Sequence, residues 1–218
     1  MEKYEIKNNT LIFNEGITEI NTYDLHFINK IGLPELNPEI KGITDIIIPD
    51  SVKVIGDKAF AFCESLKSID IPNSVIHIDR SAFAYCKSLE SITLPNRISK
   101  ISHAAFMGCA SLKKINIPNN VTAIESIAFA GCPLQDVIIP DNVTELGSNA
   151  FACCEFLENI TLPDSITTIG EESFDMCKNL TIHCNKKSYA ESYAKKNGIP
   201  FEYIDKEKAR KKNGFEKE

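Results

Sequence analysis

Six phenylalanines recur at a nearly constant spacing along the chain, and each is followed three residues later by a cysteine. The spacings between successive phenylalanines are 23, 23, 23, 22 and 23 residues. A fixed period of this size indicates one small unit stacked many times, whose copies bury their apolar sides against each other. The chain is therefore expected to form a solenoid, which favours an extended surface over a catalytic pocket. The phenylalanine–cysteine pairs are Phe60/Cys63, Phe83/Cys86, Phe106/Cys109, Phe129/Cys132, Phe151/Cys154 and Phe174/Cys177.

Each repeat contains a short segment of alternating polar and apolar residues. In one copy, this alternation predicts a strand with Ile69 facing the core and Ser68 and Asp70 facing solvent. Pro72 then ends the strand, because proline has no N–H for a ladder hydrogen bond. The phenylalanine rings of successive coils are expected to stack into one spine. The inward strand column comprises Ile69, Ile92, Ile115, Val137 and Ile160.

The combined pattern L-x-x-I-x-I/L-P-x-x-V-x-x-I-x-x-x-A-F-x-x-C, kept in six copies from about Ile43 to His183, resembles the BspA-like class of leucine-rich repeats. The segment from Lys186 to Tyr203 also resembles the C-terminal cap common in that family. The resemblance implies a leucine-rich-repeat solenoid of the α/β horseshoe class, mostly β. Its coil would be right-handed, with one curved parallel sheet on the concave side. A binding or adhesion role, often at a cell surface, is implied as well.

Four regions are predicted along the chain. They are an N-terminal cap with a degenerate repeat and an insert at 1–42, the leucine-rich repeats at 43–183, a helical C-terminal cap at 184–205, and a disordered polar tail at 206–218. The degenerate repeat is indicated by Leu11–Ile20, which matches the half-repeat Ile160–Ile169.

The insert adds about a dozen residues between Leu25 and Ile48. It is expected to cover the N-terminal end of the core, because terminal repeats of a solenoid must be capped. The alternative is a binding loop beside the sheet. Its candidate residues are Leu33, Pro34, Glu35 and Leu36.

In the C-terminal cap, Ser188 is expected to begin a helix by capping it. Glu191 and Lys195 would pair one turn apart, and Tyr189 and Tyr193 would lie on the buried side.

Eight cysteines in a secreted chain can form a disulfide framework. Here, six of them share one structural column, so their side chains should lie alongside each other and not point together. We expect a ladder of reduced, buried thiols that act as small apolar groups. A zinc site needs four ligands that converge on one point, and the four histidines fall at different phases of the repeat. No metal, cofactor or catalytic residue is predicted, and the chain is not expected to be an enzyme.

Charge is unevenly distributed along the chain, whose formal net charge is −6. Residues 51–119 carry nine basic and five acidic groups, whereas residues 120–183 carry one basic and ten acidic groups. The overall acidity argues against nucleic acid as a partner. The acidic block is either a solubility feature or a surface that steers a basic partner. No apolar run reaches the ~18 residues of a membrane helix, and the opening residues lack the apolar stretch of a signal peptide.

The sequence thus predicts a monomeric, non-enzymatic module, cytoplasmic as given, that binds a protein partner through its concave sheet. Two alternatives remain: a secreted or surface adhesin binding host or matrix protein, if a signal has been trimmed, and a structural or self-assembling element. The solvent-facing strand positions are the predicted binding residues. They are Asp45, Ile47, Ser68, Asp70, Ser91, Thr93, Lys114, Asn116, Asp136, Ile138, Asn159 and Thr161.

Overall fold

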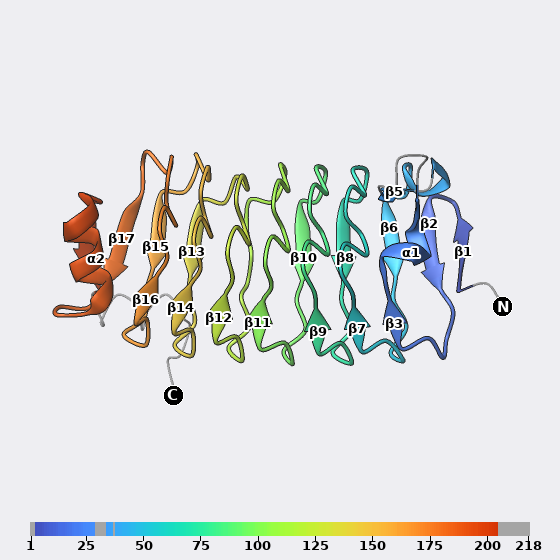
Figure 1. The fold of residues 1–218 in the computed structure, drawn as a ribbon, viewed down its shortest axis with the longest axis horizontal. Helices are drawn as coiled ribbons and strands as arrows, with labels where there is room; N and C mark the ends of the chain where they lie inside the picture. Colours follow the sequence, from blue (N-terminus) through green and yellow to red (C-terminus); the bar gives the residue numbers. More distant parts are fainter. Residues whose placement is uncertain (1–2, 29–33, 37, 205–218) are drawn as a thin grey trace, which may run out of the picture.

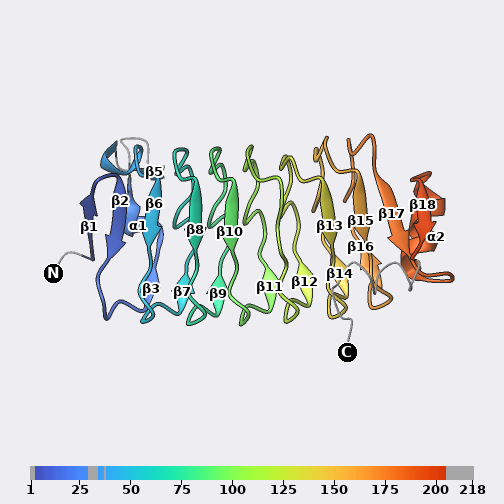
Figure 2. The ribbon, with the colours of Figure 1, turned by 180° about the vertical axis from the view of Figure 1, so that it is seen from behind.

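The computed structural model describes residues 3–28, 34–36 and 38–204; the side chains of residues 26–28, 34–36 and 39 lie outside this description. The chain forms a rod of successive coils that lie side by side, from β1 (Tyr4–Lys7) at one end to α2 (Tyr189–Asn197) at the other (Figure 1). The view from behind shows the same order of coils (Figure 2). The predicted solenoid, mostly β and built from parallel strands, is confirmed.

One side of the rod carries parallel strands of three or four residues, one from each coil except the coil that contains residues 113–116. Their register keeps equivalent repeat positions side by side, as in Ser91 opposite Ser68 and Ile92 opposite Ile69. At the N-terminal end, β1 pairs antiparallel with the first of them. The strands are β2 (Thr10–Phe13), β6 (Asp45–Ile47), β8 (Ser68–Asp70), β10 (Ser91–Thr93), β13 (Asp136–Ile138), β15 (Asn159–Thr161), β17 (Thr181–Cys184) and β18 (Phe201–Tyr203).

A second parallel ladder, which the sequence does not predict, runs along another side of the rod. Each of its strands has only two residues, one facing the core and one facing outward, and two residues are too few for a period of two to be recognised. The coils are nevertheless in register, so these short segments also pair. The strands are β3 (Glu19–Ile20), β7 (Val54–Ile55), β9 (His77–Ile78), β11 (Lys100–Ile101), β12 (Ala123–Ile124), β14 (Glu145–Leu146) and β16 (Thr168–Ile169).

The predicted phenylalanine spine is present in the core. The six rings stack with centroids 5.3–5.8 Å apart, and the planes of neighbouring rings differ by 6–27°. Both ends of the stack meet a ring edge-on: Phe13 against Phe60 at 6.1 Å, and Tyr193 against Phe174 at 6.1 Å. Offset stacking of this kind adds about 0.5–1.5 kcal/mol per pair beyond the burial of apolar area. The spine therefore links every coil to both caps.

The cysteine column lies beside this spine, and all eight cysteines are unpaired. Five thiols donate to the carbonyl oxygen of the phenylalanine in the preceding coil, at 3.1–3.2 Å. Each of these cysteines is therefore both a small apolar group and a weak hydrogen-bond donor.

The N-terminal region contains more structure than a degenerate coil. Its predicted half-repeat is present, because β2 pairs with β6 and β3 pairs with β7. The helix α1 (Thr22–Leu25) precedes the inserted segment, which includes an antiparallel pair of β4 (His26–Ile28) and β5 (Pro34–Leu36) and the 3₁₀ turn η1 (Pro38–Ile40). Of the alternative binding residues, Leu33 lies outside the described residues, and the other three form β5.

The C-terminal helix α2 begins where the sequence predicts. The Ser188 hydroxyl accepts from the Glu191 N–H at 3.1 Å, and Gly198 closes the helix in the left-handed conformation, with φ of 66°. Glu191 pairs with Lys195 at 2.5 Å. The predicted tail at 206–218 lies outside the described residues.

The predicted orientation of the α2 tyrosines is wrong for Tyr189, whose side chain is 42% exposed. Ala190 and Ala194 are fully buried in its place. Two alanines, one turn apart, allow the helix backbone to approach the last coil closely. Tyr193 is half-buried, and its ring meets Phe174, the last ring of the spine, edge to face.

Candidate functional site

The twelve predicted binding residues share one surface, which we call the strand face: the solvent side of the strands from β6 to β15. Ten of the twelve are exposed, whereas Asn159 and Thr161 are half-buried. The alternation read from the sequence therefore places these side chains on the outside, as predicted. Whether they bind a partner stays a prediction.

The polar side chains at the C-terminal end of the strand face are engaged with each other. Asn159 Nδ2 donates to Asp136 Oδ1 at 2.7 Å, and His183 Nε2 hydrogen-bonds Asn159 Oδ1 at 2.9 Å. His183 Nδ1 in turn lies 3.8 Å from a carboxylate oxygen of Glu202. A partner that docked here would first have to disrupt this row. His183 was missed as a strand-face residue, although its register opposite Thr161 places it there.

In the middle of the strand face, the backbone ladder opens. Residues 113–116 form no strand, and within the described part of the chain no backbone hydrogen bond joins them to β10. On the other side, a single long bond of 3.3 Å joins the Gln135 N–H to the Lys113 carbonyl. The equivalent bond two coils earlier, from the Glu90 N–H to the Lys67 carbonyl, is 2.9 Å. The opening lies beside the coil that has the 22-residue period.

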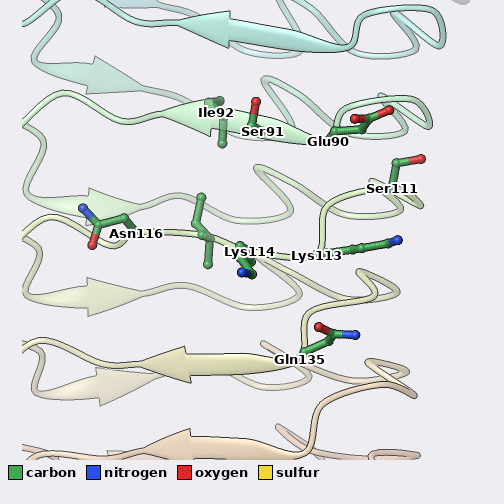
Figure 3. A pocket seen from close by; sticks show the side chains of 9 residues that line it. Glu90, Ser91, Ile92, Ser111, Lys113, Lys114, Asn116 and Gln135 are labelled. Atoms are coloured by element: carbon green, nitrogen blue, oxygen red, sulfur yellow. The ribbon is translucent and has the colours of Figure 1, made fainter. Parts of the chain in front are cut away.

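The opening contains a depression of about 660 Å³, which we call the central depression (Figure 3). Its floor includes Ile92 and Ile115, both predicted to face the core but only half-buried. Their equivalents Ile69, Val137 and Ile160 are 3%, 1% and 0% exposed. Because the backbone ladder is open between β10 and residues 113–116, the neighbouring backbone does not cover these two isoleucines. The rim is polar and includes Glu90, Ser91, Lys113, Lys114, Asn116 and Gln135.

The rim of the central depression carries two cations without counter-ions. Among the described residues, neither Lys113 nor Lys114 forms an ion pair. Lysines elsewhere on nearby coils do, as in Lys87 with Glu64 at 2.8 Å and Lys100 with Glu125 at 2.7 Å. An apolar floor beside two free ammonium groups is suited to an apolar side chain flanked by a carboxylate.

The buried cysteines are poorly suited to nucleophilic chemistry. Burial raises the pKa of Cys63 and of Cys154 to about 12, and that of Cys177 to about 11. These thiols therefore stay protonated near neutral pH, and the thiolate is the reactive form. In the part of the chain that the structure describes, no three His, Cys, Asp or Glu side chains gather as ligands for a metal ion. None of its helices there combines the length and the hydropathy needed to cross a bilayer.

Comparison with known proteins gives a consistent result. The family model described as "BspA type Leucine rich repeat region" matches six copies, over residues 39–157 and 99–198. A solved leucine-rich-repeat protein of T. pallidum is 26% identical, with a TM-score of 0.61, and the match covers 91% of this chain and 94% of that one. A leucine-rich cell surface protein of Faecalibacterium prausnitzii is 25% identical over 88% of this chain and 39% of its own length, with a TM-score of 0.46. No curated protein matches the chain significantly.

Proposed function

The chain belongs to the BspA-type leucine-rich-repeat family, and from this premise we propose that it is a non-enzymatic module that binds a protein partner through its strand face. The observation that carries the proposal is the central depression, where the backbone ladder opens and Ile92 and Ile115 reach the surface. Elsewhere the strand face is lined mostly by small polar side chains, with Ile47 and Ile138 as its isolated exposed apolar residues. Such a surface offers few of the large, desolvated contacts in which binding energy concentrates.

The chemistry of the depression indicates what the partner presents. An apolar side chain placed on Ile92 and Ile115 would remove apolar surface from water, worth roughly 25 cal/mol per Å² before the costs of association. An acidic group beside it would meet the free ammonium groups of Lys113 and Lys114. Charge complementarity at such a rim mainly raises the association rate and the specificity. We therefore propose a protein ligand that carries an apolar residue next to Asp or Glu.

The C-terminal part of the strand face is a weaker candidate for the binding site, because its polar side chains are already engaged. There, Asn159 already forms hydrogen bonds with both Asp136 and His183. In contrast, Ser91 at the rim of the depression and Thr93 next to it are exposed, and within the described residues neither side chain has a hydrogen-bond partner. The centre of the strand face can therefore accept new contacts without first losing old ones.

The test compares partner capture by three forms of the protein. Ser91→Arg with Thr93→Arg places two long side chains beside the depression, and outward positions of this kind change stability by less than about 0.5 kcal/mol per site. A matched control, His77→Arg with Ser99→Arg, makes the same addition at exposed positions on the second ladder or next to it. We expect the first variant to lose a partner that the control and the unmodified chain retain.

A second variant, Lys113→Glu with Lys114→Glu, tests the rim alone and should weaken capture while leaving the strand positions intact. Normal binding by both strand-face variants would contradict the proposal. If deletion of residues 33–38 abolished binding instead, the site would be the N-terminal insert.

A further inference from the structure

The phenylalanine-bearing turns form a third ladder, built from backbone amides, which we call the turn ladder. Each turn donates three N–H groups to the carbonyls of the next coil, and this holds for all five steps from the first turn to the sixth. In the first step the donors are Lys58, Phe60 and Phe62, and the acceptors are Arg80, Ala82 and Ala84, at 2.9, 2.8 and 2.8 Å.

The turn ladder has a direction because of its backbone conformation. In every turn, the residues two before and two after the phenylalanine are left-handed, for example Lys58 with φ of 52° and Phe62 with φ of 63°. Within each turn, every second N–H group points to the next coil, while the N–H groups between them bond to carbonyls of their own turn, as Ala59 does to Gly56 and Ala61 to Lys58. All the ladder donors therefore point toward the C-terminal end of the rod.

The sixth turn ends the ladder with three donors that have no acceptor. The N–H groups of Glu172, Phe174 and Met176 form no hydrogen bond within the described chain. One coil earlier, Asn149, Phe151 and Cys153 donate at 2.9, 2.9 and 2.8 Å. No seventh turn follows, because α2 crosses the end of the rod in its place (Figure 1). We call these three N–H groups the donor edge.

The donor edge borders a hollow of about 390 Å³. The opposite wall is the last turn of α2 and the residues after it, including Tyr193, Asn197 and Ile199. The hollow lies on a different side of the rod from the central depression and shares none of its residues.

The surroundings of the donor edge select a neutral acceptor over an anion. Glu172 and Asp175 line the hollow against a single cation, Lys178, and both carboxylates are exposed. The C-terminal end of α2 adds the negative end of a helix dipole. Residues 120–183, which include this turn, carry one basic and ten acidic groups. A phosphate would gain the three N–H groups and Lys178, but it would be repelled by two carboxylates and by the negative end of the helix dipole.

We propose that the donor edge docks an extended basic segment of a partner polypeptide as an additional rung of the turn ladder. The segment supplies carbonyl acceptors to the N–H groups of Glu172, Phe174 and Met176, and its Lys or Arg side chains pair with Glu172 and Asp175. A second copy of this chain fits less well. At its matching N-terminal edge, the Asp57 carbonyl already accepts a hydrogen bond from the Thr22 hydroxyl.

The proposal is tested with a labelled peptide of alternating Lys and Val, using amide exchange measured by NMR on the full chain. Without peptide, the three donor-edge amides should exchange freely, whereas Asn149, Phe151 and Cys153 should be protected. Bound peptide should slow exchange at the donor edge by about tenfold or more, because hydrogen-bonded amides exchange only on opening.

Two charge variants distinguish docking at the donor edge from nonspecific electrostatic attraction of the peptide to the acidic rod. Glu172→Gln with Asp175→Asn should weaken peptide binding by about tenfold, as two lost ion pairs predict. Asp141→Asn with Glu145→Gln, the same change of charge at exposed positions on another side of the rod, should leave it unchanged. The proposal fails if both variants lose affinity equally, or if the peptide binds without slowing the three amides. It also fails if inorganic phosphate or self-association slows them in the absence of peptide.

Discussion

The thiol of Cys109 donates to the carbonyl oxygen of Phe83 in the preceding coil, with 3.2 Å between sulfur and oxygen. The same contact joins four further pairs of coils. A cysteine in this column therefore points at the backbone of the preceding coil and not at the next thiol. This geometry gives the column a structural role that can be measured.

Cys109→Ala should lower the free energy of unfolding by about 1–3 kcal/mol, because it leaves a small cavity and removes the donor to Phe83. Urea denaturation gives the value. Cys153→Ala is the matched control: this side chain is exposed, and its loss should cost less than about 0.5 kcal/mol. Equal losses at the two positions would show that the column does not stabilise the core.

Alkylation of the native protein at pH 8 should be selective. The exposed Cys153 should react first. Cys63 and Cys154, whose pKa burial raises to about 12, should resist because they remain thiols more than three pH units below that value. After denaturation without reductant, mass spectrometry should find all eight thiols labelled. Two or more bridged pairs, in protein taken from its native compartment, would contradict the reduced state and with it the predicted intracellular location.

Phe106→Ala should destabilise the rod by about 3–5 kcal/mol, since it removes a fully buried ring from the middle of the spine. In a fold stabilised by contacts between neighbouring coils, such a break should uncouple the two halves. Circular dichroism should then record a broad or two-step transition. Phe62→Ala provides the control, because this ring also stacks, on Tyr85, but is 46% exposed. A single sharp transition with an unchanged midpoint would contradict the prediction for Phe106.

The C-terminal cap should be sensitive to acid. The Lys195 ammonium, the Lys187 N–H and the Tyr203 hydroxyl all hydrogen-bond the Glu191 carboxylate and lower its pKa to about 2. A depressed folded-state pKa stabilises the cap above the unfolded value of about 4.3, and this contribution is lost as the pH falls toward 2.

Amide exchange in α2, followed between pH 5 and pH 2, measures this loss after correction for the intrinsic pH dependence of exchange. Glu191→Gln should flatten the dependence, and Lys195→Ala should shift it to higher pH. An unchanged profile in both variants would rule out Glu191 as the titrating group.

The repeat spacing was enough to predict the solenoid, the spine and the outward strand residues, because each follows from side-chain periodicity. The opening at 113–116 could not be predicted in the same way. Lys114, Ile115 and Asn116 keep the polar–apolar–polar order of Ser91, Ile92 and Thr93. The only signal was one residue missing from the neighbouring coil, between Cys132 and Leu134. Whether a ladder pairs depends on backbone positions to within an ångström, which residue types do not encode.

The donor edge is a backbone property and has almost no signature in the side chains. Gly108 and Gly131, with φ of 70° and 74°, mark the left-handed position that follows the phenylalanine. In the other copies the same position holds Phe62, Tyr85, Cys153 or Met176, which conceals the pattern. Likewise, the phase of α2 depended on how closely Ala190 and Ala194 could approach the last coil, and not on the apolar character of Tyr189.

Because each step of the turn ladder has the same direction and the same hydrogen bonds, the number of coils can change while both ends of the rod stay the same. Every internal coil accepts three hydrogen bonds from the coil before it and donates three to the coil after it, so duplication of one whole repeat inserts a rung that both neighbours already fit. Gene duplication or loss of single repeats could therefore vary the distance between the two caps in steps of about 4.8 Å. The terminal surfaces, and whatever they recognise, would be inherited unchanged by rods of different length.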